Sequence, residues 1–182
     1  ILTEGPNLYK HDGWYYLMLA EGGTGWNHGI SLARSRNLPG PYELDPQMSV
    51  LTSRDDASLP LQKAGHGELV ETAAGEWYLA HLASRPLKTG GAIDPRSPDK
   101  TPAAQARAGF RCLLGRETCL QRAEWREGWL RIVGGGHHPK MSWPAAVGSG
   151  TGVPPVCSEE RSLMLATHGR DARATMREEF DS

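Results

Sequence analysis

EGPNLYKHDGWYYLMLA, residues 4–20, and HGELVETAAGEWYLAHL, residues 66–82, can be superimposed without a gap. In both stretches a strand-like run leads into a glycine-containing turn, and an aromatic-rich run follows. The offset is 62 residues, which is the separation of the turn glycines Gly13 and Gly75. The copies also match at Gly5 and Gly67, Tyr15 and Trp77, Tyr16 and Tyr78, and Leu17 and Leu79. A repeat of antiparallel hairpins at this period predicts a β-propeller, in which each unit packs against the next.

Strand-like runs bounded by turn residues continue through the first 135 residues, and no helical periodicity competes with them. These runs are residues 7–10, 14–20, 29–35, 68–72, 76–82 and 129–133. Turn sequences rich in Gly, Pro and Asp separate them, as at His11-Asp12-Gly13 and at residues 38–41. The pattern therefore predicts an all-β fold built from hairpins.

The bulk composition excludes several classes of protein. A chain of 182 residues has the size of one domain. Its formal net charge is −1, and no stretch combines clustered Lys and Arg with aromatic residues, as a nucleic-acid-binding surface would. The longest apolar run, residues 14–20, is far shorter than the roughly 18 residues of a membrane span. We therefore expect neither nucleic acid nor membrane as a partner. Because the first residue is Ile1, no leader can be read from this end, and a cytoplasmic rather than a secreted location is only an expectation.

The cysteines and the adjacent histidines do not match a known metal or disulfide pattern. Cys112, Cys119 and Cys157 are odd in number and lack C-x-x-C spacing, so we interpret them as buried or incidental thiols. His137 and His138 could be combined with Cys112 and Cys119, but that spacing fits no zinc site. Neighbours on a strand also point to opposite faces, so we expect no metal site there.

Glu4 stands at the start of the first repeat, where an apolar residue would suit a strand better. The 62-residue offset places His66 at the corresponding position of the second repeat. The first strand of each propeller blade lines the central channel, so Glu4 and His66 are expected to face one polar cavity from neighbouring blades. The alternative is that both are solvated loop residues.

Several further motifs, all in one order, make the chain resemble glycoside hydrolase family 43, and particularly its bacterial β-xylosidases. They are TEGPNLYK, GWYYLMLAEGGTGWNHGISLARS, PGPYE, VLTSRDD, PLQKAGHGELVET, GEWYLAHL and LLGRETCLQRAEW. The resemblance runs from residue 2 to about residue 135. It implies a five-bladed β-propeller of which this chain supplies about three blades, followed by a poorly ordered C-terminal segment.

The resemblance also implies a chemistry and a set of residues. In the family a general-acid Glu, a general-base Asp and a second Asp that tunes the acid hydrolyse β-xylosides or α-L-arabinofuranosides with inversion. The Glu of EGP implies that Glu4 is the acid. The His of AGH, the Arg of GRET and the Thr of GGTG imply that His66, Arg116 and Thr24 contact a xylo-oligosaccharide or arabinoside substrate. The family implies no cofactor, although a central calcium ion is an alternative.

The departures from the family are as informative as the matches. The two aspartates belong to blades that would precede Thr3, so this chain carries the acid without the base. Residues 87–110 are longer than expected and have the composition of an exposed loop. We expect the missing N-terminal blades, and a C-terminal β-sandwich, to be supplied by the same protein. The isolated chain is therefore expected to be inactive.

The sequence predicts three segments of different character. Residues 1–147 are the propeller fragment, and residues 148–177 are an inserted, disordered linker with a short helix near residues 159–166. Residues 178–182, EEFDS, resemble the entry into the missing β-sandwich. Two alternatives to an enzyme stay open: a non-catalytic carbohydrate-binding or interaction remnant of a propeller, and a structural propeller that binds proteins.

Overall fold

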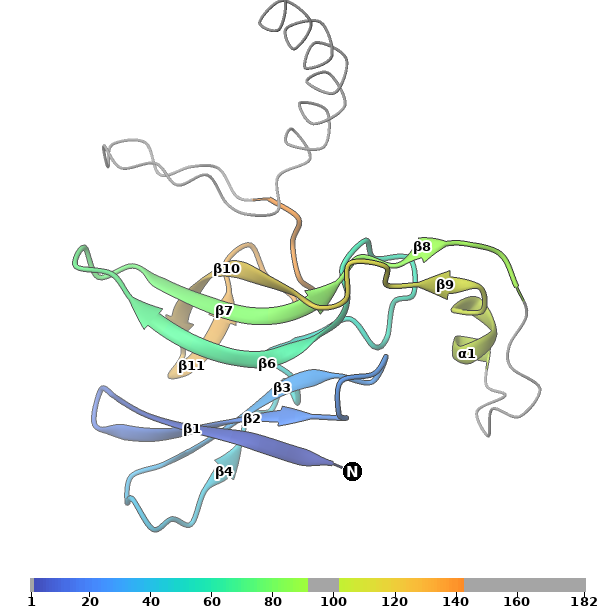
Figure 1. Cartoon of the computed structure of the whole chain (residues 1–182). Coiled ribbons are helices and arrows are strands. Elements are labelled where there is room, and N and C mark those ends of the chain that lie inside the picture. The colour runs from blue at the N-terminus through green and yellow to red at the C-terminus, as the bar shows by residue number, and fades with distance from the viewer. Residues whose placement is uncertain (1, 92–101, 143–182) are drawn as a thin grey trace, which may run out of the picture. The chain divides into compact units, whose positions relative to one another are not determined.

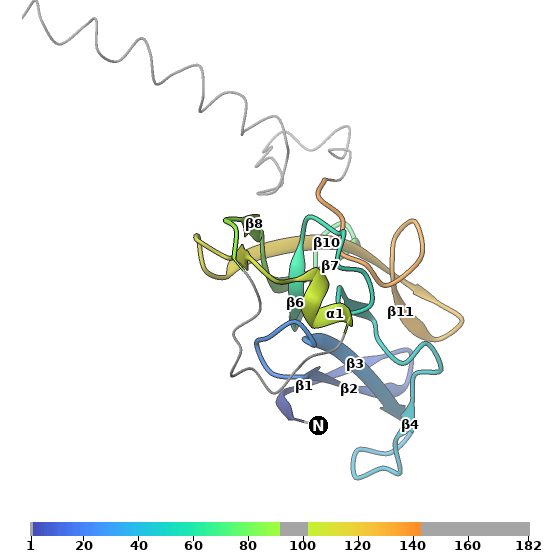
Figure 2. The same cartoon turned by 90° about the vertical axis from the view of Figure 1, so that its right-hand side faces the viewer.

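Residues 2–91 and 102–142 are described by the computed structural model, and they form two sheets of propeller-blade size (Figures 1 and 2). In the first sheet the strand order is β1–β2–β3–β4, and β5 also pairs with β3. Its strands are β1 (Thr3–His11), β2 (Trp14–Glu21), β3 (Gly29–Ser35), β4 (Glu43–Leu44) and β5 (Leu51–Thr52). Asp12 and Gly13 both have positive φ, which suits the two-residue turn between β1 and β2.

The second sheet has the strand order β11–β10–β7–β6, with antiparallel neighbours throughout. Its strands are β6 (Gln62–Glu71), β7 (Trp77–Ser84), β10 (Glu117–Arg126) and β11 (Trp129–Ile132). The sequence did not predict β10 as a strand, although it lies within the motif LLGRETCLQRAEW. Its buried residues alternate with exposed ones, as expected for a strand covered on one face.

A small hairpin and a helix interrupt the long connection between β7 and β10. They are β8 (Leu87–Lys88), paired with β9 (Phe110–Arg111), and α1 (Pro102–Ala106). The prediction of a plain exposed loop over residues 87–110 is therefore wrong for the described part of that segment. Arg107 explains why: it is only 8% exposed and donates a hydrogen bond of 2.7 Å to the carbonyl of Arg54, so the connection is fixed to the core.

The core lies between the two sheets. Met18 on β2, Ile30 on β3 and Leu79 on β7 are each at most 1% exposed. A Cβ placed on Gly67 of β6 would lie 2.6 Å from Cδ1 of Ile30, so this glycine allows the sheets to approach closely. Each buried aliphatic side chain contributes roughly 1.5–3 kcal/mol to stability.

Aromatic side chains join the sheets at the end opposite Glu4 along β1. The ring of Tyr16 lies 4.5 Å from that of Trp125, and its hydroxyl donates a 2.7 Å hydrogen bond to the carbonyl of Gly128. The guanidinium of Arg34 lies 4.3 Å from the ring centroid of Trp14 and 4.1 Å from that of Trp129. These rings therefore have a structural role.

The predicted repeat is real but shifts by one residue in the first strand of each hairpin. Ala20 pairs with Glu4, and Leu82 pairs with Gly65. Ala20 and Leu82 are 62 positions apart, but their partners are only 61 positions apart. The cause is the turn: two residues join β1 to β2, whereas the pairing of Thr72 with Glu76 leaves three residues in the second turn. Glu4 therefore corresponds to Gly65, and the assignment of Glu4 and His66 to equivalent positions was one residue off.

The all-β prediction is confirmed. The described residues form two blade-sized sheets, where about three blades were expected. Contacts divide the chain into a compact unit that ends at Lys140 and a second unit from Met141 onward. The predicted linker at 148–177, its helix at 159–166, Cys157 and the predicted β-sandwich entry at 178–182 lie outside the described residues. None of the described helices has the length and apolar character needed to cross a bilayer.

Candidate active site

Glu4 is placed by a bulge in β1. The pairing of β1 with β2 shifts between Glu4 and Asn7, and Gly5 in the bulge has a φ of +58°. A bulge bends the strand and redirects the neighbouring side chains. The residue before β1 is also attached to the loop after β2, because the N–H of Gly22 donates a 2.9 Å hydrogen bond to the carbonyl of Leu2. Glu4 is exposed at this position.

His66 sits in a corresponding bulge of β6. The pairing of β6 with β7 shifts between Gly65 and Gly67, and His66 between them has a φ of +54°. Positive φ is uncommon outside glycine, and His is one of the residues that adopt it more readily. The bulge brings the ring next to β1, because a Cβ placed on Gly5 would lie 3.0 Å from Nε2 of His66. The His66 ring thus lies beside the residue that follows Glu4.

A set of hydrogen bonds fixes β1 against β6 beside this contact. Asn7 donates through Nδ2 to the carbonyl of Gly67 at 3.0 Å and to the carboxylate of Glu68 at 3.1 Å. The hydroxyl of Tyr9 donates to the same carboxylate at 3.0 Å and accepts from the N–H of Leu69 at 3.0 Å. The first strands of the two sheets are therefore held in one register, and with them Glu4 and His66.

His28 is a member of this site that the sequence did not reveal. It is fully buried just before β3, and its ring packs on the backbone of Gly65, where a Cβ would lie 2.4 Å from Cδ2. Its Nδ1 lies 2.9 Å from the carbonyl of Glu21, while its buried Nε2 has no hydrogen-bond partner among the described residues. The only signal in the sequence was a histidine within the motif GWNHG.

The electrostatics of His28 identify its neighbours. Burial lowers its pKa, and the hydrogen bond to Glu21 opposes this effect. The charges of His66 and Arg116 lower the pKa further, whereas the charge of Glu4 raises it. The charges of three predicted site residues therefore act on this one buried imidazole.

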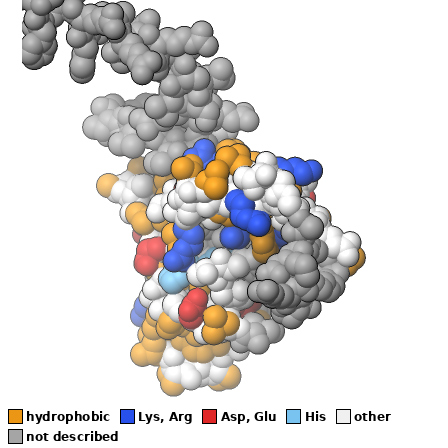
Figure 3. Space-filling view, turned by 45° about the vertical axis from the view of Figure 1, so that its right-hand side comes forward, with side chains coloured by type: hydrophobic (Ala, Val, Ile, Leu, Met, Phe, Trp, Pro, Cys, Tyr) orange, Lys and Arg blue, Asp and Glu red, His pale blue; other side chains and the backbone are white. Residues whose placement is uncertain are grey.

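Arg116 lies in the segment before β10. Gly115 accepts a 2.8 Å hydrogen bond from the hydroxyl of Ser84, and Glu117 forms an ion pair of 2.5 Å with Arg85. Both residues that flank Arg116 are thus tied to the end of β7 and the residue after it, and Arg116 itself is exposed. Figure 3 shows one face of the molecule on which basic, acidic and histidine side chains lie near one another.

Thr24 lies in the loop between β2 and β3 and is exposed. Within the described residues, no hydrogen bond joins it to Glu4, His66 or Arg116. Its place in the site is therefore still a prediction.

The group contains one carboxylate, two imidazoles and one guanidinium. A proton donor and groups that bind hydroxyls are present, but an inverting glycosidase needs a second carboxylate roughly 6.5–9.5 Å from the first. Among Glu4, His28, His66 and Arg116 there is none. Calcium prefers six to eight oxygen ligands, so these residues alone do not fit a calcium ion.

Comparison with known proteins shows which family the chain resembles. The family described as "Glycosyl hydrolases family 43" matches residues 1–130. The chain is 47% identical over 135 residues to "Xylosidase/arabinosidase 43B" of Humicola insolens, covering 74% of this chain and 22% of that protein. It is 46% identical over 134 residues to "Beta-xylosidase" of Bacillus subtilis, covering 74% and 23%.

A solved structure extends the likeness to the fold. Xylan beta-1,4-xylosidase from Bacillus halodurans C-125 is 52% identical and superimposes with a TM-score of 0.64, covering 77% of this chain and 23% of that one. The fold is accordingly a partial five-bladed β-propeller. The chain spans about a quarter of the length of these relatives.

Proposed function

The chain belongs to family 43 of the glycosyl hydrolases, and from this premise we propose that it carries the general-acid part of an enzyme that hydrolyses β-xylosides or α-L-arabinofuranosides. The observation that supports the proposal best is that Gly5, the residue after Glu4, lies against the His66 ring, while the charges of Glu4, His66 and Arg116 all act on the buried His28. The relatives named as xylosidases and arabinosidases support the same substrate class.

In this proposal Glu4, in its protonated form, donates a proton to the leaving glycosidic oxygen. Arg116 offers a planar fork of donors suited to vicinal sugar hydroxyls, and His66 offers a further polar contact from the neighbouring blade. The buried His28 would position these groups through the packing of its ring on Gly65. A water molecule would be activated by a carboxylate from blades outside this chain, which with a C-terminal β-sandwich would complete the protein.

The second candidate is a carbohydrate-binding remnant without catalysis. The presence of a single carboxylate in the site favours it. Such a remnant would bind xylo-oligosaccharides through the same Arg116 and His66 but would release no product.

A chimera tests the two candidates. The matching 134 residues of the Bacillus subtilis beta-xylosidase are replaced by those of this chain, so that the remaining blades supply the base. We expect release of nitrophenol from a nitrophenyl β-xyloside or arabinoside, and a fall of ~10²–10⁴-fold in kcat for Glu4→Gln. Glu71→Gln, which removes an exposed carboxylate at the end of β6, serves as the matched control and should keep full activity.

A folded chimera that binds xylo-oligosaccharide but does not hydrolyse either substrate would favour the remnant. Equal activity of the Glu4→Gln chimera and its parent would contradict the role of Glu4. The ratio of xyloside to arabinoside turnover would assign the substrate.

A further inference from the structure

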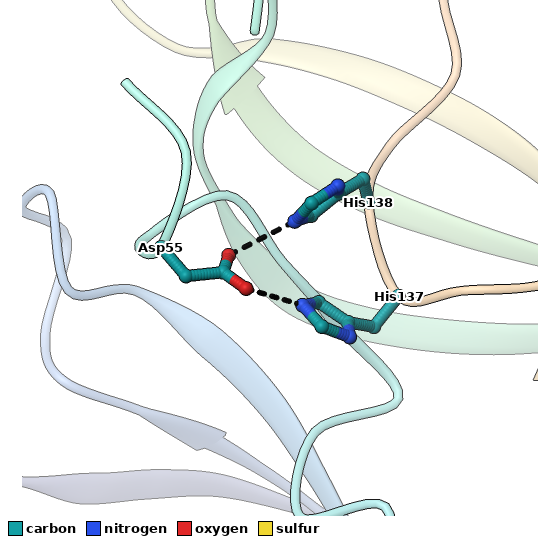
Figure 4. A group of neighbouring side chains, drawn as sticks. All are labelled: Asp55, His137 and His138. Atoms are coloured by element: carbon teal, nitrogen blue, oxygen red, sulfur yellow. Dashed lines mark hydrogen bonds and ion pairs between the residues drawn. The ribbon is translucent and has the colours of Figure 1, made fainter. Parts of the chain in front are cut away.

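Asp55, His137 and His138 form a cluster that is separate from the candidate active site (Figure 4). Nε2 of His137 lies 2.7 Å from Oδ2 of Asp55, and Nε2 of His138 lies 3.0 Å from Oδ1. Figure 4 shows the carboxylate between the two rings, with Asp55 on the connection before β6 and both histidines on the segment after β11. One ligand atom from each residue lies within 4.8 Å of the others.

The convergence of two adjacent histidines depends on where they lie. β11 ends at Ile132, so His137 and His138 are not on a strand, and the alternation that would point them to opposite faces does not apply. The carbonyl of His137 accepts a 2.8 Å hydrogen bond from the N–H of Thr52. Pro139, which is buried, restricts His138 to an extended backbone.

The backbone on both sides of the cluster is also fixed. Lys140 donates its N–H to Oε1 of Gln121 at 3.0 Å, and the amide of Gln121 donates back to the carbonyl of Lys140 at 3.1 Å. On the other side, the carbonyl of Asp56 accepts a 2.8 Å hydrogen bond from the side chain of the buried Gln62. The cluster is thus held from two anchored segments that are 82 positions apart in sequence.

The charge and exposure of the cluster suit a cation. Asp55 supplies the one acidic side chain of the cluster, and each of its two carboxylate oxygens lies next to a different imidazole. The three side chains are between 30% and 50% exposed, which leaves room for water as a further ligand.

We propose that Asp55, His137 and His138 bind one divalent transition-metal ion of the zinc class. Two imidazoles with one carboxylate is a donor set for zinc and its neighbours rather than for calcium or magnesium, which prefer oxygen. Tetrahedral zinc holds such ligand atoms at about 2.0–2.2 Å from the metal and hence about 3.3 Å apart. The observed N–O separations of 2.7 and 3.0 Å are close to that spacing, while the widest pair of ligand atoms, within 4.8 Å of each other, would have to move closer.

The bound ion would join the connection between β5 and β6 to the segment that follows β11. Because the metal binds these residues together only in the folded chain, its binding energy adds to the stability of the fold. The site lies outside the proposed catalytic group and requires no part of the chemistry proposed for Glu4.

The test is a titration of the metal-stripped 182-residue chain with Zn²⁺ alone, followed by calorimetry and by the shift in Tm. We expect one bound zinc and a higher Tm. Asp55→Asn and His138→Gln should each weaken binding by at least about tenfold, since even outer partners of a metal site are worth 10–100-fold. Asp56→Asn, the neighbouring carboxylate, is the matched control and should leave both affinity and Tm shift unchanged.

Zinc binding at this cluster must be distinguished from zinc binding at the cysteines or at His66. We expect zinc binding to survive replacement of Cys112, Cys119 and Cys157 by Ser, and to survive His66→Gln. Co²⁺ in place of Zn²⁺ should give a spectrum without thiolate charge-transfer absorption. Asn at position 55 keeps a hydrogen-bond acceptor for the histidines, so that variant is expected to fold, and far-UV circular dichroism checks it. Zinc binding that is lost with the cysteines or with His66 but retained in Asp55→Asn would overturn the proposal.

Discussion

The hydroxyl of Tyr9 on β1 accepts a hydrogen bond of 3.0 Å from the backbone N–H of Leu69 on β6. It joins the first strand of one sheet to the first strand of the next, and it donates to Glu68 at the same time. The relative position of Glu4 and His66 depends on this contact, because each lies on the same strand as one of its partners.

Tyr9→Phe should lower the free energy of unfolding by about 1–2 kcal/mol, because it leaves the Leu69 N–H without its acceptor.

The stability that Tyr9 provides should also depend on pH. Burial raises the pKa of Tyr9 to about 12; the hydrogen bond from Leu69 opposes this shift, and Glu68 adds to it. A pKa raised in the folded state gives stability that is complete below pH 10 and is lost as the pH rises from 10 towards 12. Urea denaturation across this range should show a steeper loss for the wild type than for Tyr9→Phe. Tyr15→Phe, whose hydroxyl has no described partner, is the control; equal stability of all three proteins would contradict the prediction.

His81 should make the fold sensitive to acid. It is 1% exposed, and burial lowers its pKa to about 4. Nδ1 lies 3.0 Å from the carbonyl of Leu82, and the amide of Gln121 lies 3.1 Å from Nε2, an arrangement that suits the neutral ring. A lowered pKa gives stability that is complete above pH 6.5 and is lost as the pH falls towards 4, by at most about 3 kcal/mol.

The measurement for His81 is the free energy of unfolding in urea at pH 7.5 and at pH 4. His81→Gln keeps a polar group but cannot titrate, so its stability should fall less between these two values. A parallel loss in both proteins would assign the acid sensitivity to other groups.

Gly65→Ala should destabilise the fold by roughly 1–3 kcal/mol, because the new Cβ would lie 2.4 Å from the buried ring of His28. Gly25→Ala is the matched control, since nothing lies within 4 Å of a Cβ there and the φ of Gly25 is not positive. Chemical denaturation of both variants checks the difference. A stable Gly65→Ala protein would mean that His28 is free to move.

The 182-residue chain by itself should hydrolyse aryl β-xylosides no faster than its Glu4→Gln variant, because general acid and general base each contribute typically ~10²–10⁴-fold and the base is missing. The assay is release of nitrophenol at enzyme concentrations high enough to detect slow turnover. Turnover by the parent chain that disappears in Glu4→Gln would show that another group in these residues acts as the base.

The sequence predicted the β1–β2 and β6–β7 hairpins, because alternating strands and glycine turns are local signals, whereas β10 was missed. The sequence matched Glu4 with His66, whereas the structure matches Glu4 with Gly65. The cause is the extra residue in the second turn, which an ungapped superposition of the two repeats cannot reveal. A shift of one residue reverses which face a side chain occupies, so the error affects the site directly. His66 nevertheless lies beside Gly5, because β1 and β6 each contain a bulge that redirects the side chains. These bulges are a feature of the strand pairing.

His28 and Asp55 were missed for a different reason. His28 belongs to the site because Gly65, 37 residues later in the chain, leaves room for its ring. Asp55 meets His137 through a backbone hydrogen bond between Thr52 and His137 that no local pattern encodes. Contacts between segments that are distant in sequence are set by tertiary packing, and a single sequence carries little signal for them.

The strand order of the second sheet has a consequence for synthesis. β6 and β7 are adjacent in the chain and can pair first, but β10, which covers the free edge of β7, follows only after residues 85–116. Until then the hairpin exposes an unpaired edge, so we expect docking of β10 to be the slow step of folding. Doubling the length of that connection would add about 0.6 kcal/mol of closure entropy and slow folding about threefold. The rate of unfolding should hardly change, because the connection is already closed in the transition state if docking of β10 is the slow step.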